Sequence, residues 1–572
     1  MDNPGWFGPP DRALFGWLCV PDTEEAAWGV LLCASVGEEE HNAHETFREL
    51  AHTLATHGIA SLRFDYQGTG DSVGNWTDPG RVEAWICSVQ TAYEALREIG
   101  VSKVAAVGMR FGASLVAAAA QRGLIDFDAL VLWDPCGGKS LLREGQARRP
   151  SRREPAAGAA DTPGYLYSPD TAHDMRELSV ASLPPGRIAS RLMVLTRNDR
   201  PTPRALRRRL EGDHIEWASA VGQGDLLDVP MTDNSVPIES LGQIVRWLQE
   251  IDRQPPQHLR SKLMRQLTLP TVDEGSPLSE RVVSLGRIGL FGIITEPERL
   301  RRAPTVVLIN VANDRHVGPG RRWVEYARSW AAHGFRVLRM DQSGAGDSPC
   351  HEGQQVGVLY AREWLGDLPE VLRSEELAGS PVVLISLCSG AYSAMEAAFE
   401  ERVAAIYAIN VILHATVTSK AFDLHDPRRV AARPPIAPLL RLYRVRPRLA
   451  ALLWRTYRQV TVWNAPMATV AALTRRGTDV ILVVSPNDGR HFTETAYWTA
   501  FHVWRMRWSG AYRMLKSAEV DHPLMTQEGQ IWAMSAINAD LLRRFPALPK
   551  EPPAQAALVR HRNQPRLRSQ LT

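Results

Sequence analysis

Two short segments of the chain have the composition of the tight turns that carry a catalytic nucleophile. They are residues 108–112 (GMRFG) and residues 386–390 (SLCSG). Each follows an apolar run typical of a buried strand and precedes a helical pattern rich in small residues. Small residues are expected on both sides of the centre because the backbone there is strained. The thiol of Cys388 can form an acyl intermediate, whereas the guanidinium of Arg110 stays protonated and cannot attack a carbonyl group.

The sequence contains one pattern twice, 276 residues apart. Asp65 and Asp341 each begin a turn of the form Asp-x-x-Gly-x-Gly-Asp-Ser. In the same ungapped register, a Leu-Phe-Gly segment at 14–16 matches one at 290–292, and His57-Gly58 matches a second His-Gly pair. Chance would not give so many identities in one stretch, so the chain contains one fold twice.

Strands and helices alternate in the pattern of both copies. Strands are predicted over residues 29–34, 60–64 and 103–107 and over residues 305–310, 336–340 and 381–385, with helices over residues 46–56 and 322–332. Apolar positions in these helices recur at helical spacing. Strands separated by helices form parallel sheets with crossover connections. We therefore predict an α/β protein with two tandem, doubly wound parallel sheets.

The two turn motifs together resemble the α/β-hydrolase superfamily, in the branch of serine-aminopeptidase-like and esterase-like hydrolases. The resemblance covers nearly the whole chain apart from a linker and a tail. Its motifs are specific for the fold but are poor guides to the substrate. Cys388 departs from the usual serine, as happens in some dienelactone hydrolases, polyester synthases and unusual thioesterases of this fold.

The resemblance implies a complete catalytic set in the second copy, in the chain order nucleophile, acid, histidine. Asp488 follows the strand pattern of residues 480–484, where the acid is expected, and His522 lies in the later loop that presents the base. His522 would take the proton from Cys388, Asp488 would orient the imidazole, and an acyl-cysteine would form.

An oxyanion hole is also implied. It would consist of the backbone N–H of Ser389 and one from the loop after the first strand, near Ala312 and Asn313. Taken singly, Cys388 could be a buried structural thiol and His522 an ordinary loop histidine. The correct order and spacing of turn, acid and base favour catalysis.

The first copy lacks such a set. Asp199 follows a late strand pattern and matches the acid position, but Leu226 falls roughly where the base is expected. With Arg110 at the nucleophile position, this copy is predicted to be catalytically silent. Arg110 and Asp199 could belong to a site for an acidic ligand, or the copy could be a structural partner, and the sequence leaves both open.

Changes in composition divide the chain into four parts. Residues 1–252 are predicted to form the degenerate α/β-hydrolase-like domain, and residues 279–547 the domain with the Cys-Asp-His set. Residues 253–278 are polar and contain proline, as expected of a linker. Residues 548–572 are rich in Pro, Gln and Arg, as expected of a disordered basic tail.

Each copy carries a long insertion at the place where lids usually arise in this fold. The first, at about residues 137–187, is rich in Arg, Ala, Gly and Pro and is expected to be partly disordered. The second, at about residues 413–476, interleaves arginines with leucines and predicts a basic amphipathic lid over Cys388. A solvated arginine face is the simpler interpretation. The sharper hypothesis is docking of an acidic donor, either acyl-CoA or an acyl-carrier protein.

Composition argues against several other classes of protein. A formal net charge of +3 gives no strong field for nucleic acid. The six cysteines form no close pair, and no His/Cys cluster has ligand spacing, so no metal is predicted. The glycine turns lack the dinucleotide-binding pattern, so no cofactor is predicted. With no signal-peptide pattern and no apolar run long enough for a membrane span, a cytoplasmic location is expected.

The leading hypothesis is a cysteine-dependent ester or thioester hydrolase or acyltransferase that works through an acyl-enzyme in the second copy. Water as the acceptor gives a hydrolase, whereas an alcohol or amine gives a transferase. The expected substrate is a small-molecule acyl ester or thioester. The alternative is a non-catalytic tandem protein that binds a metabolite or a protein partner.

Overall fold

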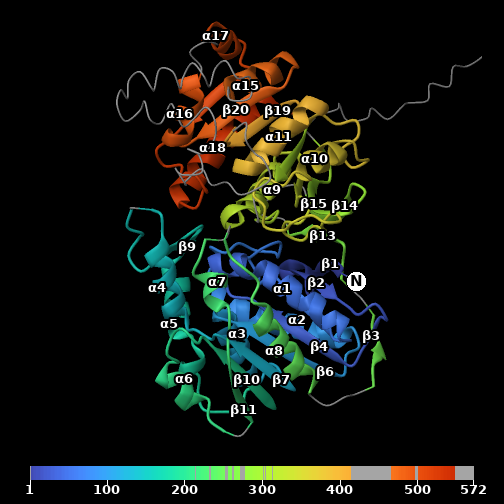
Figure 1. Ribbon diagram of the computed structural model, residues 1–572, viewed down its shortest axis with the longest axis vertical. Helices are drawn as coiled ribbons and strands as arrows, with labels where there is room; N and C mark the ends of the chain where they lie inside the picture. The colour runs from blue at the N-terminus through green and yellow to red at the C-terminus, as the bar shows by residue number, and fades with distance from the viewer. Residues whose placement is uncertain are drawn as a thin grey trace, which may run out of the picture.

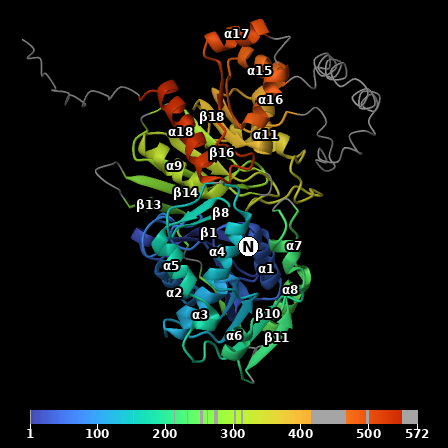
Figure 2. The same ribbon diagram turned by 90° about the vertical axis from the view of Figure 1, so that its left-hand side faces the viewer.

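The molecule consists of two α/β halves that lie end to end along its long axis (Figures 1 and 2). The computed structural model describes residues 2–151, 153–212, 214–230, 233–250, 255–260, 263–270, 277–300, 302, 304–311, 314–413, 466–495 and 500–547. Within these residues, each half contains one large sheet with helices packed against it.

The sheet of the first half has the strand order β1-β2-β5-β4-β6-β7-β10-β11. Neighbouring strands from β5 to β11 are parallel, whereas β1 and β2 are antiparallel at one edge. Parallel pairing requires long crossover connections, which the helices supply. The strands are β1 (Asp2–Phe7), β2 (Leu14–Cys19), β4 (Trp28–Cys33), β5 (Ala60–Phe64), β6 (Lys103–Met109), β7 (Ala129–Trp133), β10 (Arg191–Thr196) and β11 (Ile215–Ser219).

Helices cover both faces of this sheet. They are α1 (Glu38–Thr56), α2 (Arg81–Glu98), α3 (Phe111–Gln121), α6 (Arg204–Arg209), α7 (Gln223–Leu227) and α8 (Ile238–Gln249). Leu31 of β4 packs in the cluster with α2 and α3, whereas its neighbours Val30 and Leu32 pack with α1 and α8. Successive side chains of a strand point to opposite faces, so a strand buried on both faces is apolar throughout.

The second half repeats this arrangement. Its strand order is β13-β14-β15-β17-β16-β18-β19-β20-β21, and from β14 onward the order matches that of the first sheet. This is the strand order of the α/β-hydrolase fold, and the predicted fold class is confirmed. The strands are β13 (Gln266–Leu269), β14 (Leu278–Leu285), β15 (Leu290–Pro297), β16 (Thr305–Ile309), β17 (Arg336–Met340), β18 (Val382–Leu387), β19 (Ala405–Ile409), β20 (Asp479–Val484) and β21 (Tyr512–Lys516).

The helices of the second half also pack against its sheet. They are α9 (Arg322–Ala332), α10 (Trp364–Leu372), α11 (Cys388–Glu400), α15 (Pro466–Arg475), α16 (Pro486–Thr495), α17 (Ala500–Trp508) and α18 (Gln527–Arg544). Helix α9 has the predicted bounds. Helix α1, its counterpart, begins at Glu38, eight residues before the predicted start. The prediction missed this first part of the helix because residues 38–45 are mostly polar and show no apolar periodicity.

The insertion of the first half is mostly regular structure. It contains α4 (Gly138–Arg148), the hairpin β8 (Ala160–Thr162) and β9 (Tyr165–Tyr167), and α5 (Pro169–Glu177). Leu142 and Met175 are buried between its helices. For its described residues the prediction of partial disorder was wrong, because a few well-spaced apolar side chains suffice to pack the helices.

Two short strands lie within the residues predicted to form the linker. β12 (Gln257–His258) pairs with β3 (Glu25–Ala26) of the first half, and β13 is the outermost strand of the second sheet. Met264, between them, forms a bridge with Trp6 of β1. This segment therefore pairs with both halves.

The halves meet through equivalent residues. Asp71 and Asp347 are 276 positions apart, as are Arg63 and Arg339. Arg339 pairs with Asp71, and Arg63 pairs with Asp347 at 3.0 Å. Such reciprocal contacts are typical of the two-fold interface of a dimer, here formed within one chain.

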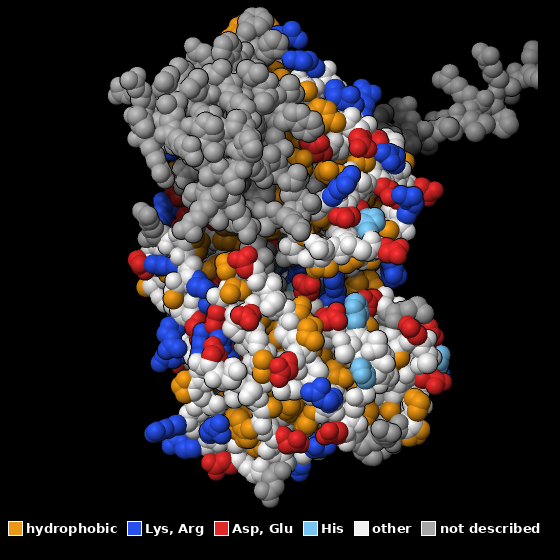
Figure 3. Space-filling model, viewed as in Figure 1, with side chains coloured by type: hydrophobic (Ala, Val, Ile, Leu, Met, Phe, Trp, Pro, Cys, Tyr) orange, Lys and Arg blue, Asp and Glu red, His pale blue; other side chains and the backbone are white. Residues whose placement is uncertain are grey.

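Acidic and basic side chains are interspersed over the described part of the face shown in Figure 3. A surface of this kind presents mixed charge rather than a single-sign field to a partner. Among the helices that the structure describes, none combines the length and apolar character that crossing a membrane requires.

Candidate active site

Cys388 lies at the junction of β18 and α11, in a strained backbone conformation. Its φ is 47°, in the left-handed region that non-glycine residues rarely occupy. Gly390 is required two positions on, because a Cβ there would lie 2.3 Å from the carbonyl oxygen of Asn310. This geometry raises the central side chain above the end of the sheet.

Arg110 occupies the same strained position between β6 and α3, with φ 54°. Gly112 corresponds to Gly390, since a Cβ there would lie 2.2 Å from the carbonyl oxygen of Ala34. The backbone of the turn is therefore the same in both halves although the central residue differs.

The predicted acid and base lie together in the second half. Nδ1 of His522 lies 3.2 Å from both carboxylate oxygens of Asp488, to which it donates. Asp488 is in the first turn of α16, where the helix dipole favours a negative charge. The hydroxyl of Ser485 donates to Asp488 at 2.6 Å, which fixes the orientation of the carboxylate.

Cys388 affects the protonation of His522 as well as Asp488 does. The hydrogen bond to Asp488, and then the interaction with Cys388, raise the pKa of His522 to about 10, although burial opposes the shift. Because Nδ1 is engaged by Asp488, Nε2 is the ring nitrogen left for the sulfur. The structure thus pairs His522 with Asp488 and places His522 where Cys388 affects its pKa.

Asn410, which the sequence analysis did not single out, connects the two loops of this group. It is fully buried after β19 with φ 43°. Its Nδ2 donates to the carbonyl oxygens of Asp521 at 2.8 Å and His522 at 3.0 Å, and its Oδ1 accepts from the N–H of Ser485 at 2.8 Å. Asn410 therefore positions both the acid and the base. Its place directly after a buried strand was the available sequence signal.

Tyr360 is a second neighbour that the sequence analysis missed. Its hydroxyl lies 3.5 Å from Sγ of Cys388, within hydrogen-bond distance of a sulfur atom. Its ring packs edge-on against Tyr392. Burial and then the charge of Cys388 raise the pKa of Tyr360, so the hydroxyl keeps its proton. The residue comes from an irregular loop that carries no motif.

The predicted oxyanion donors are only partly within the described chain. Ser389 follows Cys388 in the first turn of α11 and is buried. Its backbone N–H thus lies at the N-terminal end of α11, where helix N–H groups have no partner within the helix. Ala312 and Asn313 lie outside the described residues, as does most of the predicted basic lid.

In the first half, Arg110 is surrounded by carboxylates. Its guanidinium donates to Glu39 at 2.9 Å, Asp134 at 3.2 Å and Glu144 at 2.5 Å. Three acidic groups around one cation leave local negative charge, which disfavours the predicted binding of an acidic ligand. The structure does not join the two predicted ligand residues, because Asp199 pairs with Arg197 at 2.6 Å.

Leu226, at the position expected of a base in the first half, is buried in the core beside α1 and α8. A leucine cannot accept a proton. At the position predicted for the base, the first half therefore has no side chain that could take a proton.

Comparisons with known proteins give structural matches only. No protein-family model and no curated protein matches the sequence. Est1E from Butyrivibrio proteoclasticus, bound to ferulic acid, is 14% identical with a TM-score of 0.34 and covers 43% of this chain and 98% of its own. Mouse alpha/beta hydrolase domain-containing protein 10 is 16% identical, with a TM-score of 0.33, over 44% of this chain and 100% of its own.

A proline iminopeptidase from Mycobacterium smegmatis is 14% identical with a TM-score of 0.30 and covers 44% of this chain and 98% of its own. Each of these matches extends over less than half of the chain at low identity. The strand order of the chain itself is what identifies its fold.

Proposed function

We propose that this chain is a cysteine-dependent ester or thioester hydrolase or acyltransferase, in which Cys388 is the nucleophile, His522 the base and Asp488 the orienting acid. The observation that carries the proposal is the hydrogen bond between His522 and Asp488, together with the effect on the pKa of His522 of Cys388 at a strained strand–helix turn. A buried structural thiol has no need of a paired imidazole and carboxylate.

The first step forms an acyl-cysteine. Sγ of Cys388 bonds to the carbonyl carbon of the substrate while the π electrons move to the carbonyl oxygen, and the thiol proton is held on Nε2 of His522. The backbone N–H of Ser389 is suited to stabilise that oxyanion. As the intermediate collapses, the bond to the leaving alkoxide or thiolate breaks and His522 gives it the proton.

The second step regenerates the thiol. Water, an alcohol or an amine loses a proton to His522 and attacks the acyl carbon, and the carbon–sulfur bond breaks as Cys388 recovers the proton. Asp488 stays ionised and keeps the imidazole in one tautomer. Water gives hydrolysis and the other acceptors give transfer, so the same residues serve both outcomes.

The first half is catalytically silent in this proposal, and it contacts the loop that contains His522. The N–H of Gly164, between β8 and β9, donates to the carbonyl oxygen of Met525 at 2.9 Å, and Gln527 donates to the carbonyl oxygen of Gly164 at 2.8 Å. Met525 is three residues beyond His522. The insertion of the first half therefore braces the loop that presents the base.

The test is covalent acylation. We expect an activated acyl ester such as p-nitrophenyl acetate to label the protein once per chain by mass spectrometry, and the label to be lost in Cys388→Ala. His522→Ala should slow labelling by about 100-fold or more, as expected for loss of a general base. Cys87→Ala and Cys350→Ala, which remove exposed thiols, are the matched controls.

Equal labelling of wild type and Cys388→Ala would overturn the proposal. So would the absence of labelling and of turnover with esters and thioesters of several acyl lengths, and that result would favour a non-catalytic binding protein.

A further inference from the structure

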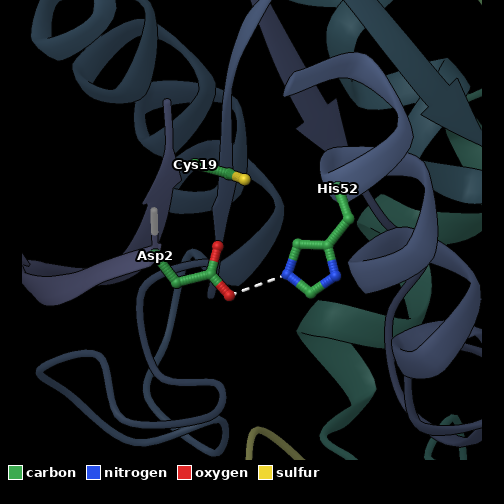
Figure 4. A group of neighbouring side chains, drawn as sticks. All are labelled: Asp2, Cys19 and His52. Atoms are coloured by element: carbon green, nitrogen blue, oxygen red, sulfur yellow. Dashed lines mark hydrogen bonds and ion pairs between the residues drawn. The ribbon is translucent and has the colours of Figure 1, made fainter. Parts of the chain in front are cut away.

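Asp2, Cys19 and His52 form a group of three potential metal ligands in the first half (Figure 4). Asp2 begins β1, Cys19 ends β2 directly opposite it, and His52 is in α1. One ligand atom from each side chain lies within 4.8 Å of the other two. Nε2 of His52 lies 2.8 Å from Oδ2 of Asp2. The atoms are thus as close as a common ion would require with small side-chain adjustments.

The group is buried on one side and open on the other. Cys19 is 3% exposed, whereas the side chains of Asp2 and His52 are 30% and 45% exposed. An ion can therefore reach the group from solvent, and a water molecule can complete its coordination. The sulfur of Cys19 would bind the ion on its buried side.

Without an ion, His52 is hydrogen-bonded to Asp2 and the thiol of Cys19 keeps its proton. Burial, and then the charge of Asp2, raises the pKa of Cys19 to about 12, so its thiol is neutral at pH 7. Burial works against ionisation of Asp2, but the hydrogen bond from His52 holds the pKa of that carboxyl below its usual value. The charge of Arg63 also lowers the pKa of Asp2. A bound cation would replace the hydrogen bond between His52 and Asp2 and the proton of the Cys19 thiol.

The second half provides an internal comparison at the same place in the fold. Glu280 faces Thr295 across the β14–β15 pair, just as Asp2 faces Cys19 across the β1–β2 pair. Thr295 is 276 residues from Cys19, and Arg328 is 276 residues from His52.

At the corresponding place in the second half, arginine side chains already supply the positive charge. Arg328 pairs with Glu280 at 2.8 Å and Arg339 pairs with it at 3.1 Å, while Thr295 donates to it at 2.9 Å. The first half has His52 in place of Arg328 and Cys19 in place of Thr295. Both replacements put a metal-ligand atom beside the carboxylate, and one removes a guanidinium.

We propose that Asp2, Cys19 and His52 bind a divalent cation of the zinc class, with a water molecule in the remaining position. A thiolate, an imidazole and a carboxylate together suit zinc or cobalt rather than magnesium or calcium, which prefer oxygen ligands throughout. On binding, the thiol releases its proton to solvent, and the His52–Asp2 hydrogen bond is exchanged for two metal–ligand bonds.

Cobalt(II) titration tests the site, because a cobalt–thiolate bond gives an intense near-ultraviolet absorption that histidine and carboxylate ligands do not give. The chain carries any tag at its C-terminal end and the Cys388→Ala substitution, which removes a second thiol–imidazole pair. We expect one Co²⁺ per chain with this absorption, and its displacement by Zn²⁺.

Two variants identify the ligands. Cys19→Ser should remove the absorption. His52→Arg, which installs the residue of the second half and a built-in cation, should weaken Zn²⁺ binding by more than about 100-fold while leaving the thermal unfolding temperature of the metal-free protein unchanged or higher. His57→Arg, an exposed histidine at the end of the same helix, is the matched control and should bind as the parent does.

Failure of the parent to develop the absorption would overturn the proposal. Its persistence in Cys19→Ser would do so too, because the thiolate would then belong to another residue. If Cys19→Ser fails to fold, the His52→Arg and His57→Arg pair still decides the matter, since equal affinity in the two would exclude His52 as a ligand.

Discussion

The protonation of His522 controls the proposed chemistry at the scale of single residues. Its pKa is raised to about 10, first by Asp488 and then by Cys388. The imidazole is therefore protonated at neutral pH and ready to act as an acid toward the leaving group. The pair also stabilises the fold fully below the ordinary histidine value of 6.5, and this contribution is lost as the pH rises through about 10.

We expect activity to fall as the pH rises through about 10, because His522 loses the proton that it donates. In Asp488→Asn the principal cause of the raised pKa is gone, so the alkaline limb should move to lower pH, and kcat/KM at pH 7 should fall by up to about 10⁴-fold. A pH profile of kcat/KM for both proteins measures this. An alkaline limb at the same pH in the variant would contradict the assigned role of Asp488.

At the scale of elements, the two strand–helix turns share one backbone and differ in use. Gly112 and Gly390 each lie against the loop after the first parallel strand, with a Cβ position 2.2 Å and 2.3 Å from a carbonyl oxygen. Neither site can accept a side chain unless α3 or α11 moves away from the sheet. The glycines are structural requirements of the turn, independent of the nucleophile.

Gly112→Ala and Gly390→Ala are therefore a matched pair. Each should destabilise its half by about 1–3 kcal/mol through overpacking, measured by thermal or urea unfolding. Only Gly390→Ala should lower kcat strongly, because it displaces Cys388 from His522. Equal loss of activity in both variants would show that the first turn takes part in catalysis.

At the scale of the whole molecule, the halves are joined by buried charges that alternate in sign. His316 lies between Asp71 of the first half at 2.6 Å and Asp341 of the second at 2.9 Å, and all three side chains are buried. Burial opposes the charge on His316, but Asp71 and then Asp341 raise its pKa to about 10. Arg339 and His316 likewise hold the pKa of Asp71 below its usual value, against the effect of burial.

The junction should accordingly be most stable between these limits. As the pH falls below the ordinary carboxyl value of 3.8 the contribution of Asp71 is lost, and as it rises through about 10 that of His316 is lost. Asp71→Asn leaves buried cations with less compensation and should cost about 3–5 kcal/mol near pH 7. Thermal unfolding across pH checks both expectations, with the exposed ion-pair variant Glu83→Gln as control. A variant as stable as wild type at pH 7 would rule out this account of the junction.

The contact between Gly164 of the first half and Met525, in the loop that contains His522, gives a second prediction at the scale of the whole molecule. Gly164→Pro removes the N–H that donates to Met525 and is incompatible with φ 80°. It should lower kcat in the second half by about 10-fold or more, through misplacement of His522. Gly158→Pro introduces a similar strain in the same insertion, but Gly158 contacts Pro169 and Arg176 of the first half.

Steady-state kinetics with a p-nitrophenyl ester measures the difference between these two variants. Equal effects would mean that general damage to the insertion, and not the contact with Met525, lowers the rate.

The sequence by itself determined the α/β class, the internal repeat and the parallel strands β4, β5 and β6 with their counterparts β16, β17 and β18, because these depend on local periodicity and on repeated turn residues. It also placed Cys388, Asp488 and His522 after the ends of three strands, β18, β20 and β21, and parallel strands bring such ends to one edge of a sheet. It could not identify Asn410 or Tyr360, since neither belongs to a spaced motif.

Only the tertiary structure decided which side chains meet across distant segments. The sequence predicts no metal site because Asp2, Cys19 and His52 have no ligand spacing along the chain. An antiparallel strand pair and a helix packed on it bring them together. Likewise, the sequence left Arg110 open as a cation that could bind a ligand, whereas the structure pairs it with three carboxylates. Contacts of this kind depend on how whole elements pack, and chain order alone does not encode them.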